Sequence, residues 1–116
     1  MCYIERKVMK KEKKFENWLQ TTKGLSAKTT ESRISNCRRL DKLYDLDKQY
    51  ELNRCNGLLR SLSYPKKAEL LGVPVLHRVP MDGNLYEGTA TLRSALRLYV
   101  EFMDSGIHTR KITPLL

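Results

Sequence analysis

Apolar residues recur at intervals of three or four positions near the end of the chain, and this spacing restricts the fold more than any other feature. The positions are Leu92, Ala95, Leu96, Tyr99, Phe102 and Met103. On an α-helix these side chains form a single stripe that requires a partner surface. Asn84 and Glu87 make a capping pair before the stripe, and Gly106 supplies a stop after it. The pattern predicts one long amphipathic helix.

Two earlier segments show the same periodicity. From residue 4 to residue 22, the apolar positions of the first stripe are Ile4, Val8, Phe15, Trp18 and Leu19. Gly24 is expected to end this helix in a left-handed conformation, with Leu25 folding back on its last turn. Ser26 is expected to cap a second helix from Ala27 to about Tyr44. Its apolar face carries Ile34, Cys37, Leu40 and Tyr44.

The middle of the chain is less regular. A shorter third helix is predicted to end at residues 57–62, although Gly57 weakens it. Pro65, Pro74 and Pro80 prevent one long helix over residues 63–83. We expect a short turn from Pro65 that stops at Gly72, followed by an extended segment through Pro80. With no convincing pair of strands, the sequence predicts an all-α bundle of four to five helices with a Pro-rich extended loop before the last helix.

Composition restricts the class of protein. The 116 residues, of which 41% are apolar, suffice for one domain with one core. A net charge of +9 favours a polyanionic partner, either nucleic acid or an anionic membrane surface. The three cysteines fit neither a disulfide framework nor a metal knuckle, which favours a reducing cytoplasm. We find no stretch long and apolar enough to span a membrane and no signal peptide, so we expect a soluble, cytoplasmic protein.

The sequence offers no catalytic constellation. The two histidines, His77 and His108, have no cysteine or carboxylate at ligand spacing, so we expect them to be solvated or locally hydrogen-bonded. Cys37 lies on an apolar helix face and is expected to be a small core residue rather than a reactive thiol. The chain is therefore predicted to be non-enzymatic, with no metal and no cofactor.

Basic residues gather where the second helix is expected to begin. Lys23 and Lys28 flank the capping Ser26, and Thr29 follows. A helix N-terminus offers free N–H groups and partial positive charge, so these four residues form a candidate phosphate clamp. Arg33 and Arg39 extend the basic surface along the same helix. The alternative is an ordinary capped surface helix with solvated lysines.

The last helix carries a second basic surface. Arg93 and Arg97 are four residues apart and lie beside Thr89 and Ser94, which makes one polar strip next to the apolar stripe. Arginine among small residues suits a DNA major groove, where it donates two hydrogen bonds to guanine. Alternatively, Arg97 pairs with Glu101 or both arginines point into water. Membrane binding is disfavoured because glutamates interrupt the run of lysines from residue 10 to residue 14.

Two segments resemble the core-binding domain of tyrosine recombinases and phage integrases, a SAM-like helical bundle. The first is FENWL at residues 15–19 with GLSAKT at residues 24–29, and the second is ATLRSALRLYVEF at residues 90–102. The segment LLRSL at residues 58–62 is similar to the middle helix. The resemblance covers residues 15–103, and it implies that Ser26, Lys28 and Thr29 approach phosphates. It also implies that Arg93, Ser94 and Arg97 face the DNA groove.

Two departures limit what the resemblance implies. The connector at residues 63–83 is longer than the family's, and a tail at residues 107–116 stands where the catalytic domain would begin. The family's catalytic Arg, Lys, His-x-x-Arg and Tyr cannot be placed, so strand cleavage is not expected unless the chain is a fragment. We predict one helical domain over residues 1–116 that binds duplex DNA and derives from a mobile genetic element. The alternative is a module that binds a protein partner or itself through its apolar edges and the loop from Pro65 to Pro80.

Overall fold

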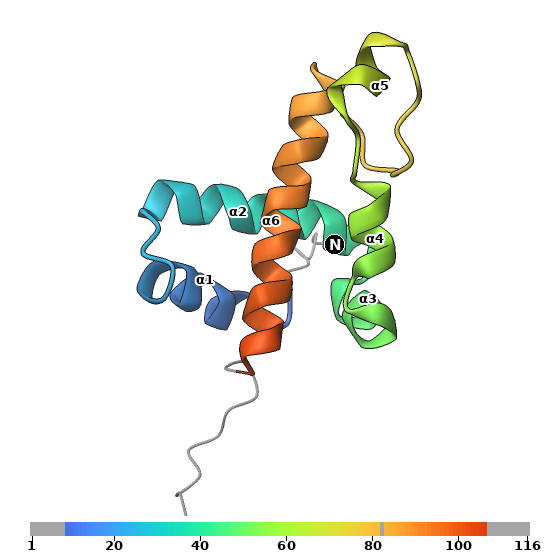
Figure 1. Ribbon diagram of the computed structural model, residues 1–116. Coiled ribbons are helices and arrows are strands. Elements are labelled where there is room, and N and C mark those ends of the chain that lie inside the picture. Colours follow the sequence, from blue (N-terminus) through green and yellow to red (C-terminus); the bar gives the residue numbers. More distant parts are fainter. Residues whose placement is uncertain (1–8, 82, 107–116) are drawn as a thin grey trace, which may run out of the picture.

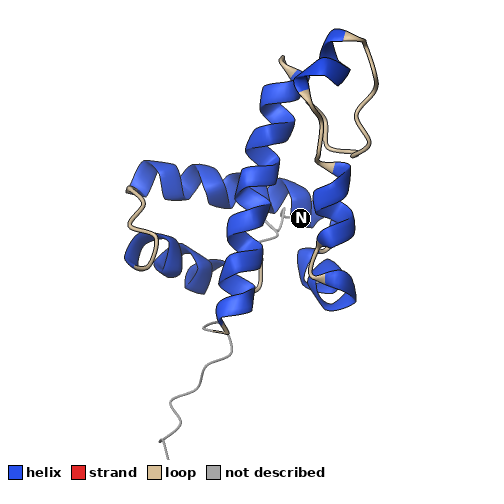
Figure 2. Cartoon of the chain, in the orientation of Figure 1, coloured by secondary structure: helices blue, strands red, loops and turns tan. Residues whose placement is uncertain are grey.

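The computed structural model describes residues 9–81 and 83–106, which form six helices and, within those ranges, no strand (Figures 1 and 2). The all-α prediction is confirmed at this level. The helices are α1 (Glu12–Thr21), α2 (Ala27–Tyr44), α3 (Leu46–Asn53), α4 (Asn56–Ser61), α5 (Lys66–Leu70) and α6 (Leu85–Ser105).

Helix α6 is the element around which the others are arranged. It crosses in front of α2, with α1 on one side and α3 and α4 on the other, while α5 lies beside its N-terminal end (Figure 1). All six residues of its predicted apolar stripe are buried, and Thr89 is buried with them. Asn84 Oδ1 accepts a hydrogen bond from the Glu87 backbone N–H at 2.8 Å, and Gly106 closes the helix with φ 74°. The predicted start and stop are both confirmed.

Aromatic side chains join α1 to α6. The ring of Phe15 meets Tyr99 edge-on and Phe102 at a tilt, with 5.2 Å between centroids in both pairs. Trp18 packs against Phe102 at 5.7 Å. These rings are almost completely buried, so they belong to the core, as their positions on the two apolar stripes predicted.

The first helix is shorter in the structure than the sequence pattern suggested. Helix α1 begins at Glu12, and the expected stripe positions Ile4 and Val8 lie outside the described residues. Its end agrees with the prediction because Gly24 is left-handed, with φ 67°. The Leu25 backbone N–H donates to the Leu19 carbonyl oxygen at 3.0 Å, which folds the chain back on the last turn.

Helix α2 has the predicted bounds and the predicted cap. The Ser26 hydroxyl accepts a hydrogen bond from the Thr29 backbone N–H at 3.1 Å. Ile34, Cys37 and Leu40 are buried on its inner face, whereas Tyr44 is only half-buried.

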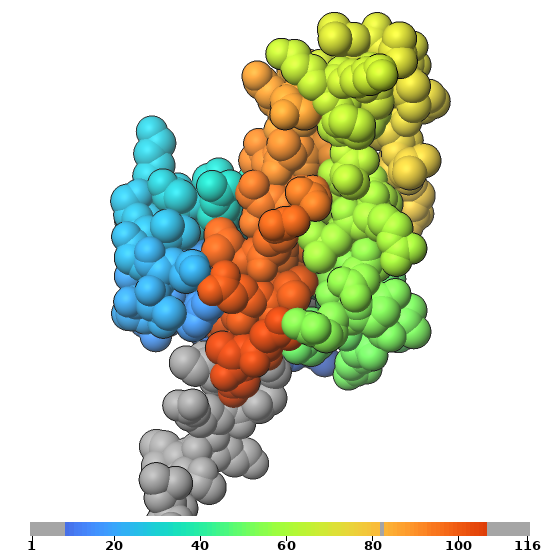
Figure 3. All heavy atoms as spheres, viewed as in Figure 1, coloured from blue at the N-terminus to red at the C-terminus, as the bar shows by residue number. Residues whose placement is uncertain are grey.

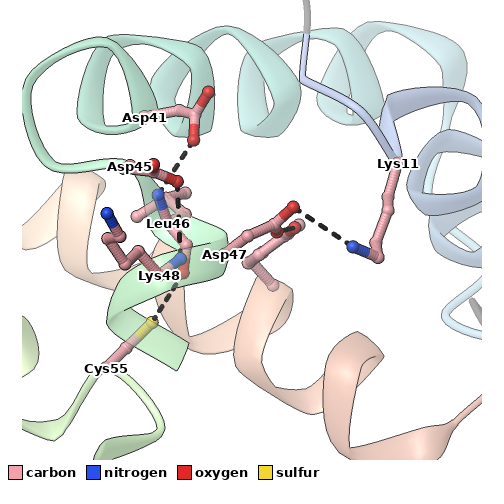
Figure 4. A network of polar contacts seen from close by, with 8 residues as sticks. Lys11, Asp41, Asp45, Leu46, Asp47, Lys48 and Cys55 are labelled. Atoms are coloured by element: carbon pink, nitrogen blue, oxygen red, sulfur yellow. Dashed lines mark hydrogen bonds and ion pairs between the residues drawn. The ribbon is translucent and has the colours of Figure 1, made fainter. Parts of the chain in front are cut away.

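The prediction of a single third helix after α2 is wrong, because the structure has two helices there, α3 and α4. Arg54 and Cys55 both adopt left-handed backbone angles, with φ 57° and 63°, and they separate α3 from α4. The helix count is therefore six within the described residues, rather than four or five. Burial explains the break: the Cys55 side chain is fully buried at the turn, with Sγ 3.8 Å from the Leu46 carbonyl oxygen (Figure 4).

The Pro-rich connector is packed onto the bundle for part of its length. Pro65 caps α5 rather than occupying its first helical position. The chain from Val73 to Pro80 contains no helix, but it bends at Leu76 and His77 instead of running extended throughout, as the sequence predicted. His77 and Val79 are buried. The Arg78 backbone N–H donates to the Tyr44 hydroxyl at 2.7 Å, which fixes the connector to the end of α2.

Candidate nucleic-acid interface

The phosphate clamp predicted at the start of α2 is only partly open to a ligand. Ser26 and Lys28 are exposed, while Thr29 is half-buried. The Ser26 hydroxyl is bonded to both the backbone N–H and the hydroxyl of Thr29, each at 3.1 Å. The Ser26 hydroxyl therefore accepts a hydrogen bond from its own helix, and Lys28 is an exposed cation of this site with no carboxylate partner among the described residues.

Lys23 is engaged by α1 and α6. Its Nζ lies 2.9 Å from Glu101 Oε2 and 5.8 Å from the centre of the Trp18 ring. Glu101, which the sequence spacing makes a possible partner of Arg97, pairs with Lys23 in the structure. The ion pair is largely exposed, so a phosphate could compete for Lys23 at a modest cost.

The two arginines predicted to extend the clamp along α2 have different surroundings. Arg39 Nη2 donates to the Pro80 carbonyl oxygen at 2.8 Å, so this residue helps to hold the connector against α2. Arg33 is half-buried, and its Nε has no hydrogen-bond partner in the described structure. Neither side chain is an unconstrained surface cation.

The polar strip on α6 is exposed along most of its predicted length. Ser94 and Arg97 are exposed and Arg93 is half-buried. The outer face of α6 lies open between the α1–α2 pair and α4 (Figure 3). These three residues are referred to below as the arginine strip.

Thr89 does not belong to the arginine strip, which corrects the prediction that it lies on the same surface. Its side chain is fully buried, and its hydroxyl is 2.9 Å from Nε2 of His77. The helical wheel placed Thr89 near the polar face, but the connector covers that part of α6. A buried, bonded hydroxyl is not available to a duplex in this conformation.

Arg60 is the basic residue that the sequence analysis did not select. It lies on α4 and, with Arg93, lines a shallow pocket of about 260 Å³. The remaining lining residues are Asn56, Leu59 and Ser63. No sequence pattern links positions 60 and 93, because the pocket exists only once α4 packs against α6.

The ion pairs divide the basic residues into two groups. Four pairs join the described residues: Lys11–Asp47, Lys23–Glu101, Arg38–Glu12 and Arg54–Asp104. Within the same part of the chain, no carboxylate pairs with Lys28 or with Arg60, Arg93 and Arg97. The cations without a carboxylate partner thus include three arginines of α4 and α6.

Carboxylates gather elsewhere, where α2 meets α3, and their bonds are internal (Figure 4). Asp41 Oδ1 accepts from the Leu46 backbone N–H at 2.9 Å, and Asp45 Oδ1 accepts from the Lys48 backbone N–H at 3.4 Å. Asp47 accepts from Lys11 at 3.1 Å and from the Tyr99 hydroxyl at 2.6 Å. Burial raises the pKa of Asp47, but these two hydrogen bonds outweigh it and hold that pKa below its ordinary value.

The thiols and the buried imidazole have the character of core groups. Burial raises the pKa of Cys55 to about 12 and also raises that of Cys37, whose Sγ lies 3.4 Å from the Ala95 carbonyl oxygen. Burial, together with the charge of Arg39, lowers the pKa of His77. The described residues contain no group of three or more His, Cys, Asp or Glu side chains that could hold a metal ion.

Comparisons with known proteins found no matching protein-family model, no matching curated protein and no matching solved structure. In the part of the chain that the structure describes, no helix has the length and apolar character required to cross a membrane.

Proposed function

We propose that this chain is a non-catalytic, cytoplasmic module that binds duplex DNA through the arginine strip of α6 and the start of α2. The observation that carries the proposal is the position of Arg93 and Arg97. They lie one turn apart on α6, next to Ser94, and no carboxylate of the described chain pairs with them. Arginines held on a rigid helix without a counter-charge are suited to phosphate and to guanine.

The resemblance of residues 15–29 and 90–102 to the core-binding domain of tyrosine recombinases supports the same proposal. In that family's pattern, the start of the second helix and the closing helix are the elements that contact DNA. The SAM-like arrangement and the origin in a mobile genetic element rest on this resemblance alone. Arg97 and Ser94 keep exposed positions that agree with such a role, as does Lys28.

The salt dependence of binding to random duplex DNA tests the proposal. If about four to six phosphates are neutralised, the slope of log affinity against log salt concentration should lie near −4 to −5. A fluorescence-anisotropy titration at several salt concentrations measures this slope. The absence of duplex binding at low salt would contradict the function proposed.

A protein-interaction role is the second candidate, and one observation favours it. Four large apolar side chains of α5 and the connector are exposed, namely Leu70, Leu71, Val73 and Leu76, with fractions from 45% to 77%. Exposed apolar side chains gathered in one region mark interaction surfaces in folded proteins. Association through them would change little with salt, in contrast to DNA binding. Sedimentation at increasing protein concentration, with Leu76→Ser as the variant, detects self-association.

A further inference from the structure

The pocket between α4 and α6 has the composition of an anion site. Arg60 and Arg93 line it together with Asn56, Leu59 and Ser63, and no acidic residue is among them. We propose that this pocket binds one phosphate of the nucleic-acid backbone, held between the guanidinium groups of Arg60 and Arg93. The inference rests on the proposed DNA-binding function and assigns to it a specific phosphate position.

The charges of Arg60 and Arg93 favour an anion in the pocket. Two guanidinium groups that line one small pocket repel each other unless an anion lies between them or a carboxylate is close. Among the described residues, no carboxylate pairs with Arg60 or Arg93. Four other cations do have a carboxylate partner, namely Lys11, Lys23, Arg38 and Arg54. An anion in the pocket would supply the missing counter-charge.

An unpaired hydrogen-bond donor of Arg93 also favours an anion in the pocket. Arg93 Nε is buried and has no hydrogen-bond partner within the described structure. A buried N–H donor without an acceptor raises the free energy of the unbound protein, so a ligand oxygen that accepts from it would stabilise the bound state. The planar guanidinium group matches phosphate oxygens with two parallel donors.

The neutral lining residues complete the set of donors. The Asn56 side-chain amide and the Ser63 hydroxyl both donate hydrogen bonds and carry no charge, so they add contacts without further repulsion between cations. The pocket is shallow, and its volume of about 260 Å³ leaves a bound group accessible from the surface. A phosphate that is part of a long polymer requires such an open site.

The pocket gives Arg93 a different role from Arg97. Arg97 is exposed and remains available to a base edge, whereas Arg93 is half-buried beside Arg60 and contacts the backbone. Backbone contacts carry no sequence information. Loss of Arg93 should therefore weaken binding equally on all duplexes.

The test compares Arg60→Gln and Arg93→Gln with Lys13→Gln, a variant that removes the same charge from an exposed position on α1. Duplex binding is measured by fluorescence anisotropy on two unrelated sequences over a range of salt. Each arginine variant should bind about tenfold more weakly on both sequences, because one charge-assisted contact is lost. The salt slope should flatten by about one. The double variant should lose less than the product of the two single losses, since both residues hold one phosphate.

The possible outcomes distinguish a failure of the pocket proposal from a failure of the proposed DNA-binding function. If wild type binds duplex and both arginine variants bind as Lys13→Gln does, the pocket proposal is overturned while the DNA-binding function stands. If the wild-type protein binds no duplex, the pocket proposal and the proposed DNA-binding function both fail. Inorganic phosphate, titrated while the Arg93 Nε–H resonance is followed by NMR, then shows whether the pocket is instead a site for the free anion. Circular dichroism of each variant confirms that the helices persist.

Discussion

At the scale of single residues, the imidazole of His77 is held in one protonation state by its neighbours. The Val79 backbone N–H donates to Nδ1 at 3.1 Å, so Nδ1 must be the unprotonated acceptor. Nε2 then carries the proton and donates to the Thr89 hydroxyl at 2.9 Å. A second proton on Nδ1 would break the bond to Val79, which is consistent with a pKa lowered by burial and by Arg39.

This arrangement predicts that the protein becomes less stable as the pH falls below about 6.5, the ordinary pKa of histidine. Above that pH His77 is neutral in both the folded and unfolded states, and its bonds contribute fully. Below it, the unfolded chain takes up a proton that the folded chain resists, so the free energy of unfolding falls by up to about 1.4 kcal/mol per pH unit. Urea unfolding at several pH values measures the fall.

The matched variant for this prediction is His77→Gln, which lacks the titrating group. Its stability should be lower overall but should change less between pH 6.5 and pH 5. The carboxylates of Glu12, Asp47 and Asp104 have lowered pKa values, so their contributions are lost only at more acidic pH. If the variant kept the whole pH dependence of wild type, His77 would not be its source.

The phenols of Tyr50 and Tyr99 are held in the protonated form by their surroundings. Burial and the hydrogen bond to Asp47 raise the pKa of Tyr99, and the hydrogen bond to Asp104 raises that of Tyr50. Because the Arg, Lys, His-x-x-Arg and Tyr set of tyrosine recombinases cannot be placed in the sequence, we expect purified protein neither to nick nor to relax supercoiled plasmid in an agarose-gel assay. Nicking activity that is lost in a single Tyr→Phe variant would contradict the proposal that the chain is non-catalytic.

At the scale of elements, α6 contributes most to the core, which makes it the place for a packing test. Leu96 is completely buried near the middle of the helix. Leu96→Ala should lower the free energy of unfolding by about 2–5 kcal/mol, because it leaves a cavity as well as removing apolar contacts. Leu70→Ala, at a side chain that is 76% exposed, is the control and should change stability by less than about 0.5 kcal/mol. Equal effects of the two substitutions in chemical denaturation would mean that the buried face of α6 is assigned wrongly.

The elements that sequence predicted well are those with both a periodic stripe and a cap. Helix α2 has Ser26 and α6 has Asn84, and in each the capping side chain accepts the expected backbone N–H. The break between α3 and α4 could not be foreseen, since Arg54 and Cys55 are not residues that favour left-handed angles. In the assembled bundle this turn buries Cys55 and brings Arg54 to Asp104 of α6, two tertiary contacts that the local sequence does not reveal.

Individual residues of the candidate site could be predicted from the sequence, but their arrangement in space could not. Lys28, Arg93 and Arg97 were recognisable from cap chemistry, helical spacing and resemblance. The burial of Thr89 depends on the connector, and the pairing of Lys23 with Glu101 joins positions 78 residues apart. Arg60 was missed for the same reason, because its relation to Arg93 is created by tertiary packing.

At the scale of the whole molecule, stability should depend on packing rather than on cross-links. Cys37 and Cys55 are free thiols, and both are buried. We expect thermal unfolding, followed by far-UV circular dichroism, to be one cooperative loss of helix. Its midpoint should be the same with and without a chelator or a reductant. A shift of several degrees on adding a chelator would reveal a metal on which the fold depends.

The distribution of charge over the whole molecule provides the last prediction. Lys28 is exposed at the start of α2 and has no carboxylate partner in the described chain, whereas Lys23 is held by Glu101. If the start of α2 contacts DNA phosphates together with the arginine strip, Lys28→Ala should weaken binding similarly on every duplex sequence. It should also flatten the salt slope by about one, because one fewer counterion is released.

The control for this prediction is Lys13→Ala, which removes an equal charge from an exposed position on α1. Charge loss alone should lower affinity slightly and leave the slope almost unchanged, since a cation that touches no phosphate releases no bound counterion. Arg97→Ala provides the contrast: at a base edge it should cost about 1–3 kcal/mol on a preferred sequence and less on others. Anisotropy titrations of the three variants on several duplexes separate these cases. If Lys28→Ala and Lys13→Ala gave the same slope as wild type, the start of α2 would lie outside the DNA-binding surface, and binding would depend on α4 and α6 alone.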